Sequence, residues 1–453
     1  MGFREGFVWG AATASYQVEG GAQEGGKGRS IWDDFSHTAG KVYADHNADV
    51  SCDHYHRFRD DVALMKALGI RNYRFSVSWP RVLPEGTGEP NEAGLRFYDE
   101  LVDALLENGI RPLVTLYHWD LPSSLQRRGG WQSPESPAWF EAYASLVVRR
   151  FGTRVQDYFT FNEPQCIVGL GNILGSMAPG LMLSPRETIP MSYHIHLAHG
   201  LAASRIRELM PRARIGFVGC GPASIPATDS PADIEAARQA YFSLPTADPM
   251  EWVWSASWWA DPVMLGSYPE DGLTHFGQYL PRGFEKRLPQ IGQRIDYYAH
   301  NYYQGDRYRA GGAQGFEEQP WPAGHPRTAN DWAVSPDTLY WGPRFLHERY
   351  KAPIFITENG MSGHDWVSLD GQVHDPQRID FLHRYLRALR RAAEDGVDVY
   401  GYLAWSFLDN FEWNSGYRER FGLVHVDYQT LARTPKDSAY WYRQVMQENG
   451  ANL

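Results

Sequence analysis

The chain has 453 residues, of which 43% are hydrophobic and 21% charged, and its formal net charge is −11. A negative chain without clustered lysine and arginine lacks the footprint of a nucleic-acid-binding protein, so a neutral small-molecule ligand is favoured. No apolar run reaches the length of a secretory or membrane-spanning segment, which predicts a cytoplasmic protein with no membrane partner.

The elements predicted in chain order alternate between short apolar strands and longer amphipathic helices. The strands are predicted over 8–12, 72–77, 112–117, 158–161, 214–218, 294–300, 353–357 and 397–403. The clearest helical patterns cover 60–68, 94–107, 139–151, 193–208 and 378–393. This alternation predicts an α/β fold, a single (β/α)₈ TIM barrel that makes one catalytic domain of residues 1–453. Residues 219–294 are irregular and are expected to hold insertions.

The cysteines give no sign of a metal centre. Cys52, Cys166 and Cys220 cannot all pair, and their spacing is not that of metal ligands. We therefore expect three small buried thiols in a reducing compartment, with no metal. Oligomeric state cannot be deduced from these features.

Polar residues follow the predicted strands at the end where an α/β barrel carries its active site. These residues are Arg74, His118, Asn162, Glu163, Asn301, Glu358 and Trp405. Two of them are glutamates, each beside an asparagine after an apolar strand. A carboxyl pair in unlike surroundings can protonate a leaving oxygen and attack an oxocarbenium-like centre, as glycoside hydrolysis requires. A lone glutamate there is more often a surface or capping residue, but two matching sites weaken that alternative.

Motifs along almost the whole chain resemble those of glycoside hydrolase family 1. They lie at 7–20 (FVWGAATASYQVEG), 73–79 (YRFSVSW), 117–122 (YHWDLP), 162–164 (NEP), 301–303 (NYY), 357–360 (TENG) and 405–413 (WSFLDNFEW). The resemblance implies a β-glucosidase-type enzyme that retains anomeric configuration and uses no cofactor. Its partners are expected to be small β-glycosides or short oligosaccharides.

The family pattern implies a role for each motif residue. Glu163 is expected to be the acid/base and Glu358 the nucleophile, with Arg74 as its cation and Tyr303 as its hydrogen-bond donor. The implied substrate-binding residues are Gln17, His118, Trp119, Asn162, Asn301, Trp332, Trp405, Glu412 and Trp413. Trp332 is expected on the aglycone side. Departures from the pattern at Gln165, Asn172 and 299–300 leave the aglycone preference open, and glucosides, galactosides and fucosides all remain candidate substrates.

Three alternatives were weighed. A thioglucosidase is disfavoured because that branch of the family has glutamine in place of the acid/base glutamate, whereas this chain has Glu163. A 6-phospho-β-glycosidase is disfavoured because the family's phospho-specific members replace the residue at Glu412 and add a nearby lysine. Arg418 and Arg420 could supply a cation, but an exposed loop or an ion pair with Glu419 is the expected use of both. A catalytically silent sugar-binding barrel is disfavoured because binding alone needs no nucleophile.

Overall fold

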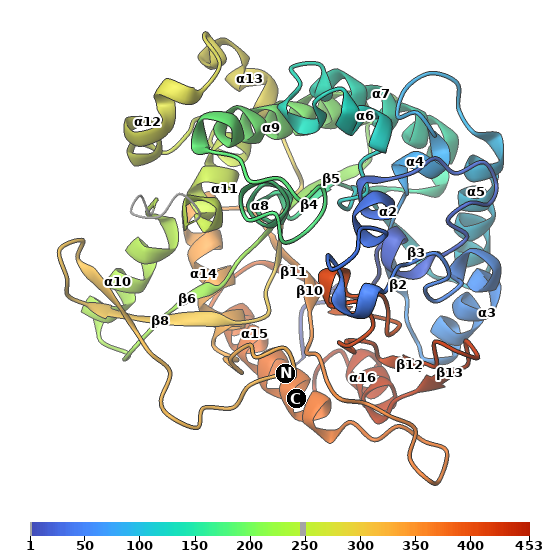
Figure 1. The fold of residues 1–453 in the computed structure, drawn as a ribbon. Coiled ribbons are helices and arrows are strands. Elements are labelled where there is room, and N and C mark those ends of the chain that lie inside the picture. Colours follow the sequence, from blue (N-terminus) through green and yellow to red (C-terminus); the bar gives the residue numbers. More distant parts are fainter. Residues whose placement is uncertain (1, 245–250) are drawn as a thin grey trace.

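Eight parallel strands form one closed barrel in the computed structural model, which describes residues 2–244 and 251–453 (Figure 1). The strands are β1 (Val8–Ala12), β2 (Asn72–Ser76), β3 (Arg111–Tyr117), β4 (Asp157–Asn162), β5 (Arg214–Cys220), β7 (Tyr297–Asn301), β10 (Ile354–Asn359) and β11 (Val399–Trp405). They follow one another around the barrel in sequence order, and β1 closes it against β11. The predicted barrel is therefore confirmed. The largest difference in strand position is at β7, which begins at Tyr297 rather than at 294.

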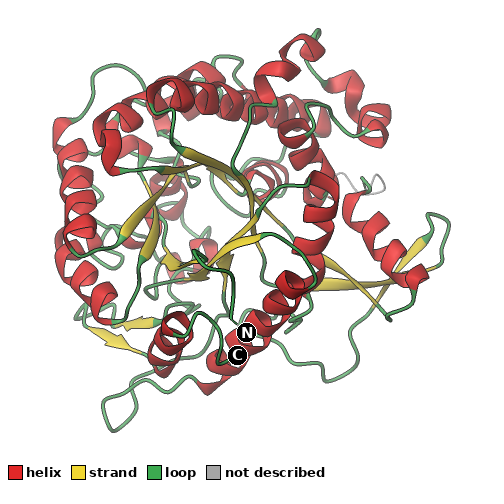
Figure 2. Ribbon diagram, turned by 180° about the vertical axis from the view of Figure 1, so that it is seen from behind, coloured by secondary structure: helices red, strands yellow, loops and turns green. Residues whose placement is uncertain are grey.

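Helices surround the strands as a ring (Figure 2). They include α3 (His54–Ala67), α5 (Glu92–Glu107), α7 (Ser136–Phe151), α9 (Pro185–Leu209), α14 (Thr338–Tyr350) and α15 (Pro376–Glu394). Four of the five predicted helices fall within members of this set, and the fifth, 60–68, extends one residue beyond the end of α3. In α5 the buried Leu95, Tyr98, Leu101 and Leu105 recur at three- and four-residue steps. Such spacing places one apolar stripe against the barrel and leaves the opposite face polar.

An ion-pair cluster connects three strands at the end of the barrel where the strands begin. Asp157 begins β4 and is buried, while Arg111 and Arg214 begin the neighbouring β3 and β5. Both guanidiniums donate two hydrogen bonds to this carboxylate, at 2.5–2.8 Å from Arg111 and 2.7–2.9 Å from Arg214. Bidentate pairs of this kind fix geometry, so the cluster holds the starts of these strands in register.

The two ends of the chain lie side by side in both ribbon views (Figures 1 and 2). The Phe3 amide donates to the carbonyl of Asn449 at 2.9 Å, and the Trp9 indole donates to the Asn449 side chain at 2.9 Å. These bonds attach β1 and the segment before it to the turn that follows α16 (Asp437–Gln447). The first and last elements therefore support each other.

A second sheet extends from the barrel after β5 and β7. It contains β6 (Ala223–Pro226), β8 (Gly305–Ala310) and β9 (Phe316–Gln319), and α10 (Pro231–Phe242) packs against it. Part of the irregular segment 219–294 is thus an insertion, as expected. Across the described ranges, no helix combines the length and apolar character needed to span a bilayer.

Candidate active site

A cavity of about 730 Å³ opens at the ends of the barrel strands. The site residues predicted from the sequence that line it are Glu163, Glu358, Tyr303, His118, Trp119, Asn301, Trp332, Trp405, Glu412 and Trp413. The remaining three, Arg74, Gln17 and Asn162, are fully buried and contact lining residues through hydrogen bonds. The structure therefore brings the whole predicted set together from opposite sides of the barrel.

Glu358 is held by two donors. Arg74 Nη1 donates to its Oε1 at 2.7 Å, and the Tyr303 hydroxyl donates to its Oε2 at 2.7 Å. Burial raises the pKa of Glu358, while Arg74 first and Tyr303 after it act against that rise. Both carboxylate oxygens are thus bonded to groups that favour the ionised form.

Backbone packing fixes the position of Glu358. Gly360 follows it by two residues, and a Cβ at that position would lie 1.9 Å from the carbonyl oxygen of Trp405. Only glycine permits so close an approach between the ends of β10 and β11. The glycine of the motif at 357–360 is therefore required for the nucleophile candidate and Trp405 to face the same cavity.

Glu163 lies in different surroundings. It follows β4 and precedes α8 (Pro164–Val168) with a left-handed backbone at φ 49°, an uncommon conformation for a non-glycine residue. Asn301 Nδ2 donates to its Oε1 at 2.8 Å, but no cation forms an ion pair with it among the described residues. Burial, followed by the nearby negative charge of Glu358, raises the pKa of Glu163 to about 8. This carboxyl therefore keeps its proton at neutral pH.

Near Glu358 and Glu163 lies a group of buried polar side chains, some of whose atoms have no hydrogen-bond partner among the described residues. Arg74 Nη2 donates to Asn162 Oδ1 at 2.6 Å, and Asn162 Nδ2 lies 3.1 Å from His118 Nε2. Burial lowers the pKa of His118 well below its usual range, so the ring is neutral. Gln17 Oε1 and His118 Nδ1 are buried without a hydrogen-bond partner in the described part of the chain. Buried polar atoms without partners are rare, and ligand hydroxyls would satisfy both.

Glu412 belongs to the same group of polar side chains. Gln17 Nε2 donates to its Oε2 at 3.2 Å. Burial, and then the negative charge of Glu358, raise the pKa of Glu412 to about 8. A protonated carboxyl can both donate and accept a hydrogen bond, which suits a neutral, polyhydroxylated ligand.

Aromatic rings line the cavity beside these polar groups. Trp119 and Trp413 lie 4.5 Å apart between centroids, and His118 stacks at 5.9 Å from Trp405. Trp119 Nε1 also donates to the Asn162 carbonyl at 3.0 Å. Aromatic faces beside hydrogen-bonding groups match a sugar ring, which has an apolar face and a polar edge.

Comparison with known proteins identifies, along almost the whole chain, the same family that the sequence motifs resemble. The model for glycosyl hydrolase family 1 matches residues 1–451. The chain is 42% identical to β-glucosidase A of Acetivibrio thermocellus, over 99% of both sequences. A solved β-glucosidase from Thermotoga maritima in complex with glucoimidazole is 40% identical, with a TM-score of 0.91 over 99% of both chains. Another structure of that enzyme, with galacto-hydroximolactam, gives a TM-score of 0.90 at 40% identity and the same coverage.

The chain belongs to glycosyl hydrolase family 1. The family recognised from the motifs is thereby confirmed, and so is the expectation of a glycoside hydrolase.

The outer part of the cavity in this family 1 hydrolase contains residues that sequence reasoning missed. Phe421 packs against Tyr303 and Trp332, with both centroid distances at 6.0 Å. The second sheet adds the lining residues Asp306, Tyr308, Phe316 and Glu318. None of these belongs to a recognised motif, because each lies in a loop or insertion. Their only sequence signal is their proximity to the polar strand ends.

The departures from the family pattern do not border the cavity. Gln165 and Asn172 are buried, and Asn172 Nδ2 donates to the Ile167 carbonyl at 2.7 Å. His300 is also buried and packs on Tyr302, with ring centroids 4.1 Å apart. These residues contribute to the packing around the site, whereas other residues line the cavity.

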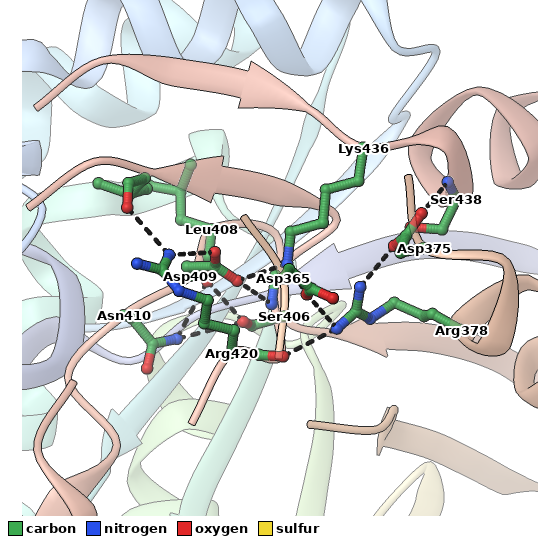
Figure 3. A network of polar contacts seen from close by, with 12 residues as sticks. Asp365, Asp375, Arg378, Ser406, Leu408, Asp409, Asn410, Arg420, Lys436 and Ser438 are labelled. Carbon is green, nitrogen blue, oxygen red and sulfur yellow. Dashed lines mark hydrogen bonds and ion pairs between the residues drawn. The ribbon is translucent and has the colours of Figure 1, made fainter. Parts of the chain in front are cut away.

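The cations that follow Glu412 in the sequence are engaged elsewhere (Figure 3). Arg420 Nη1 donates to Asp409 Oδ2 at 2.7 Å. The buried Lys436 lies 2.7 Å from Asp409 Oδ1 and 2.5 Å from Asp365 Oδ2. None of the described lining residues of the cavity is a lysine or arginine.

Arg418 and Arg420 differ in their partners. Arg418 is exposed and pairs with Glu419 at 2.9 Å, as expected. The same expectation is wrong for Arg420, because its side chain turns toward the buried Asp409 carboxylate instead. A fully buried carboxylate is stable only when it is paired with a cation, and Arg420 is one of the cations paired with Asp409.

Proposed function

We propose that this protein is a retaining β-glucosidase that removes terminal β-D-glucosyl residues, with galactosides and fucosides as further substrates to be tested. The proposal rests on one contrast. Glu358 is ion-paired to Arg74 and Glu163 has no ion-pair partner in the part of the chain that the structure describes, yet both carboxyls line one cavity. That contrast supports an ionised nucleophile beside a protonated acid. The β-glucosidase names of the relatives and their sugar-mimic complexes agree with it.

In the first step, a Glu358 oxygen attacks the anomeric carbon while Glu163 gives its proton to the departing glycosidic oxygen. The aglycone leaves as an alcohol, and the sugar remains as an ester on Glu358. Ester formation removes the negative charge of Glu358, which is the second-largest cause of the raised pKa of Glu163. Its pKa falls, so Glu163 becomes the base for the second step.

In the second step, water gives a proton to the Glu163 carboxylate and its oxygen attacks the anomeric carbon. The bond to Glu358 breaks, and both carboxyls return to their starting states. Asn162 is proposed to bind the 2-hydroxyl, with Gln17, His118 and Glu412 binding the other hydroxyls. Trp405 and Trp413 supply the apolar surface, and Trp332 contacts the aglycone.

Replacement of Tyr303 by phenylalanine tests the proposed ionisation of Glu358. Glu358 acts as a carboxylate, so activity is lost as the pH falls through its pKa. The variant loses the hydroxyl that lowers this pKa, and the acid limb of kcat/KM should move up by about one pH unit. The basic limb, set by Glu163 near pH 8, should remain in place.

The matched control is Tyr302→Phe. The Tyr302 hydroxyl is buried against Tyr241 at 2.5 Å, and its side chain does not border the cavity. Its pH profile should therefore keep the wild-type acid limb. An unshifted limb in Tyr303→Phe, or an equal shift in both variants, would contradict the assigned role.

A paired assay with an aryl β-glucoside and its 6-phosphate tests the proposed substrate class. We expect kcat/KM to favour the unphosphorylated substrate by at least about a hundredfold, equivalent to about 2.8 kcal/mol. Glu412 is proposed to lie near the sugar, in a cavity whose described lining residues include no lysine or arginine. Burial already disfavours the charged form of the Glu412 carboxyl. A phosphate would add up to two more charges, with no paired cation to offset their desolvation.

Comparable rates on the two substrates would mean that Glu412 does not face the 6-position. A preference for the phosphate would favour a 6-phospho-β-glycosidase. No hydrolysis of any unphosphorylated or phosphorylated aryl glycoside would favour a silent sugar-binding barrel.

We further propose that residues 1–453 act as one catalytic domain in the cytoplasm. Three free, buried cysteines support a reducing compartment. Activity recovered in the cytosolic fraction of the source cells would test this location, and activity in the secreted fraction would contradict it.

A further inference from the structure

Two cysteine thiols lie next to the proposed acid/base. Cys166 is in α8, one helical turn after Glu163, and Cys220 is the last residue of β5. Their Sγ atoms are 3.7 Å apart, and one ligand atom from each of the three residues lies within 4.8 Å of the others. All three residues line the active-site cavity. Neither thiol has a role in the proposed reaction.

The sulfur separation matches that of two ligands on one tetrahedral ion. Zinc–thiolate bonds are about 2.3 Å long, so two thiolates at the tetrahedral angle place their sulfurs about 3.8 Å apart. The observed 3.7 Å is close to this value, whereas a disulfide needs sulfurs at about 2.05 Å. The two thiols are therefore spaced to bind one ion with little movement.

The third ligand and the open coordination position also fit. A carboxylate oxygen completes a three-residue set of two thiolates and one oxygen, which suits a borderline-soft divalent cation. The cavity borders the set, so an ion can enter from solvent and a water molecule can occupy the fourth position. Glu163 is also the carboxyl of the catalytic pair that Arg74 does not contact, so an ion would not displace that cation.

We propose that Glu163, Cys166 and Cys220 form an inhibitory site for a zinc-like divalent cation. Binding releases the two thiol protons and the Glu163 proton to solvent, and the ion occupies a Glu163 oxygen. The carboxyl can then no longer exchange a proton with the substrate. The loss of activity rests on the proposed role of Glu163, whereas binding of the ion does not. The ion is an inhibitor and not a cofactor, so the prediction that catalysis uses no metal is unaffected.

Cadmium is a suitable probe because its thiolate complexes absorb in the ultraviolet. The reduced, metal-free enzyme is titrated with Cd²⁺ while charge-transfer absorption and aryl β-glucoside hydrolysis are recorded. We expect both signals to change together, to saturate at about one ion per chain, and to be reversed by a chelator.

Cysteine variants locate the site. Cys220→Ala should lose most of the absorption band, because one of the three proposed ligands is removed. It should also require at least about tenfold more Cd²⁺ for half inhibition. Cys166→Ala should behave alike and provides a second test if one variant folds poorly. Cys52→Ala is the matched control, because Cys52 is also buried but contacts the Asp409 carbonyl at 3.0 Å and does not border the cavity. It should keep the wild-type response.

Absence of a stoichiometric band in the wild-type enzyme would overturn the proposal. So would a wild-type response in both Cys166→Ala and Cys220→Ala, or loss of the response in Cys52→Ala alone. A full band with undiminished hydrolysis would support the ion site and contradict the role of Glu163.

Discussion

The Glu358→Ala enzyme is expected to lose turnover of aryl β-glucosides on the order of 10⁴-fold or more, while retaining the fold. The substitution removes the only carboxylate that Arg74 and Tyr303 both contact in the described structure. No glycosyl ester can then form, and Glu163 alone cannot replace the covalent step. Steady-state hydrolysis measures the loss, and circular dichroism checks the fold.

Added azide should restore part of the activity of Glu358→Ala. The small anion can enter the space left by the side chain and attack the same face of the sugar, which gives the α-glycosyl azide. Glu317→Ala is the matched control, because Glu317 is an exposed carboxylate in β9 that pairs with Arg309 and does not border the cavity. It should retain wild-type turnover. Formation of the β-azide by Glu358→Ala would mean that the two glutamates have exchanged roles.

The Glu163→Ala enzyme is expected to show a loss that depends on the leaving group. For poor leaving groups the first step needs the Glu163 proton, and turnover should fall by about 10²- to 10⁴-fold. For very good leaving groups the first step should remain fast, so the glycosyl enzyme accumulates and its hydrolysis limits the rate. A burst of released phenol followed by slow turnover measures this.

Azide provides the control for this variant as well. It should accelerate turnover of the accumulated intermediate and give the β-glycosyl azide, because it attacks from the face that water uses. An equal loss across leaving groups, without a burst, would contradict the assignment of Glu163 as the acid/base.

The barrel and its site could be predicted because their signals are local in sequence. Each strand is a short apolar run, and the residues at its end, such as Glu163 and Glu358, face one cavity once the barrel closes. The raised pKa of Glu412 depends instead on burial and on Glu358, 54 positions away. The sequence does not predict this shift, because burial at a loop residue has no local pattern.

Contacts between side chains that are not adjacent in the sequence could not be predicted either. Arg420 follows Glu419 directly, and the sequence predicts an exposed loop or an ion pair with Glu419, but the guanidinium pairs with the buried Asp409. Cys166 and Cys220 have no metal-like spacing, yet α8 and the end of β5 bring their thiols together. The first pairing depends on how the connection at 406–423 folds, and the second on the pairing of β4 with β5. The spacing of residues along the chain encodes neither.

Proton NMR of the sugar first released from an aryl β-glucoside shows whether the reaction proceeds by double displacement. Two displacements, by Glu358 and then by water, each invert the anomeric carbon, so the first product retains its configuration. We expect β-glucose to appear first and the α-anomer to form only as the free sugar equilibrates. Appearance of α-glucose as the first product would contradict the double displacement through Glu358.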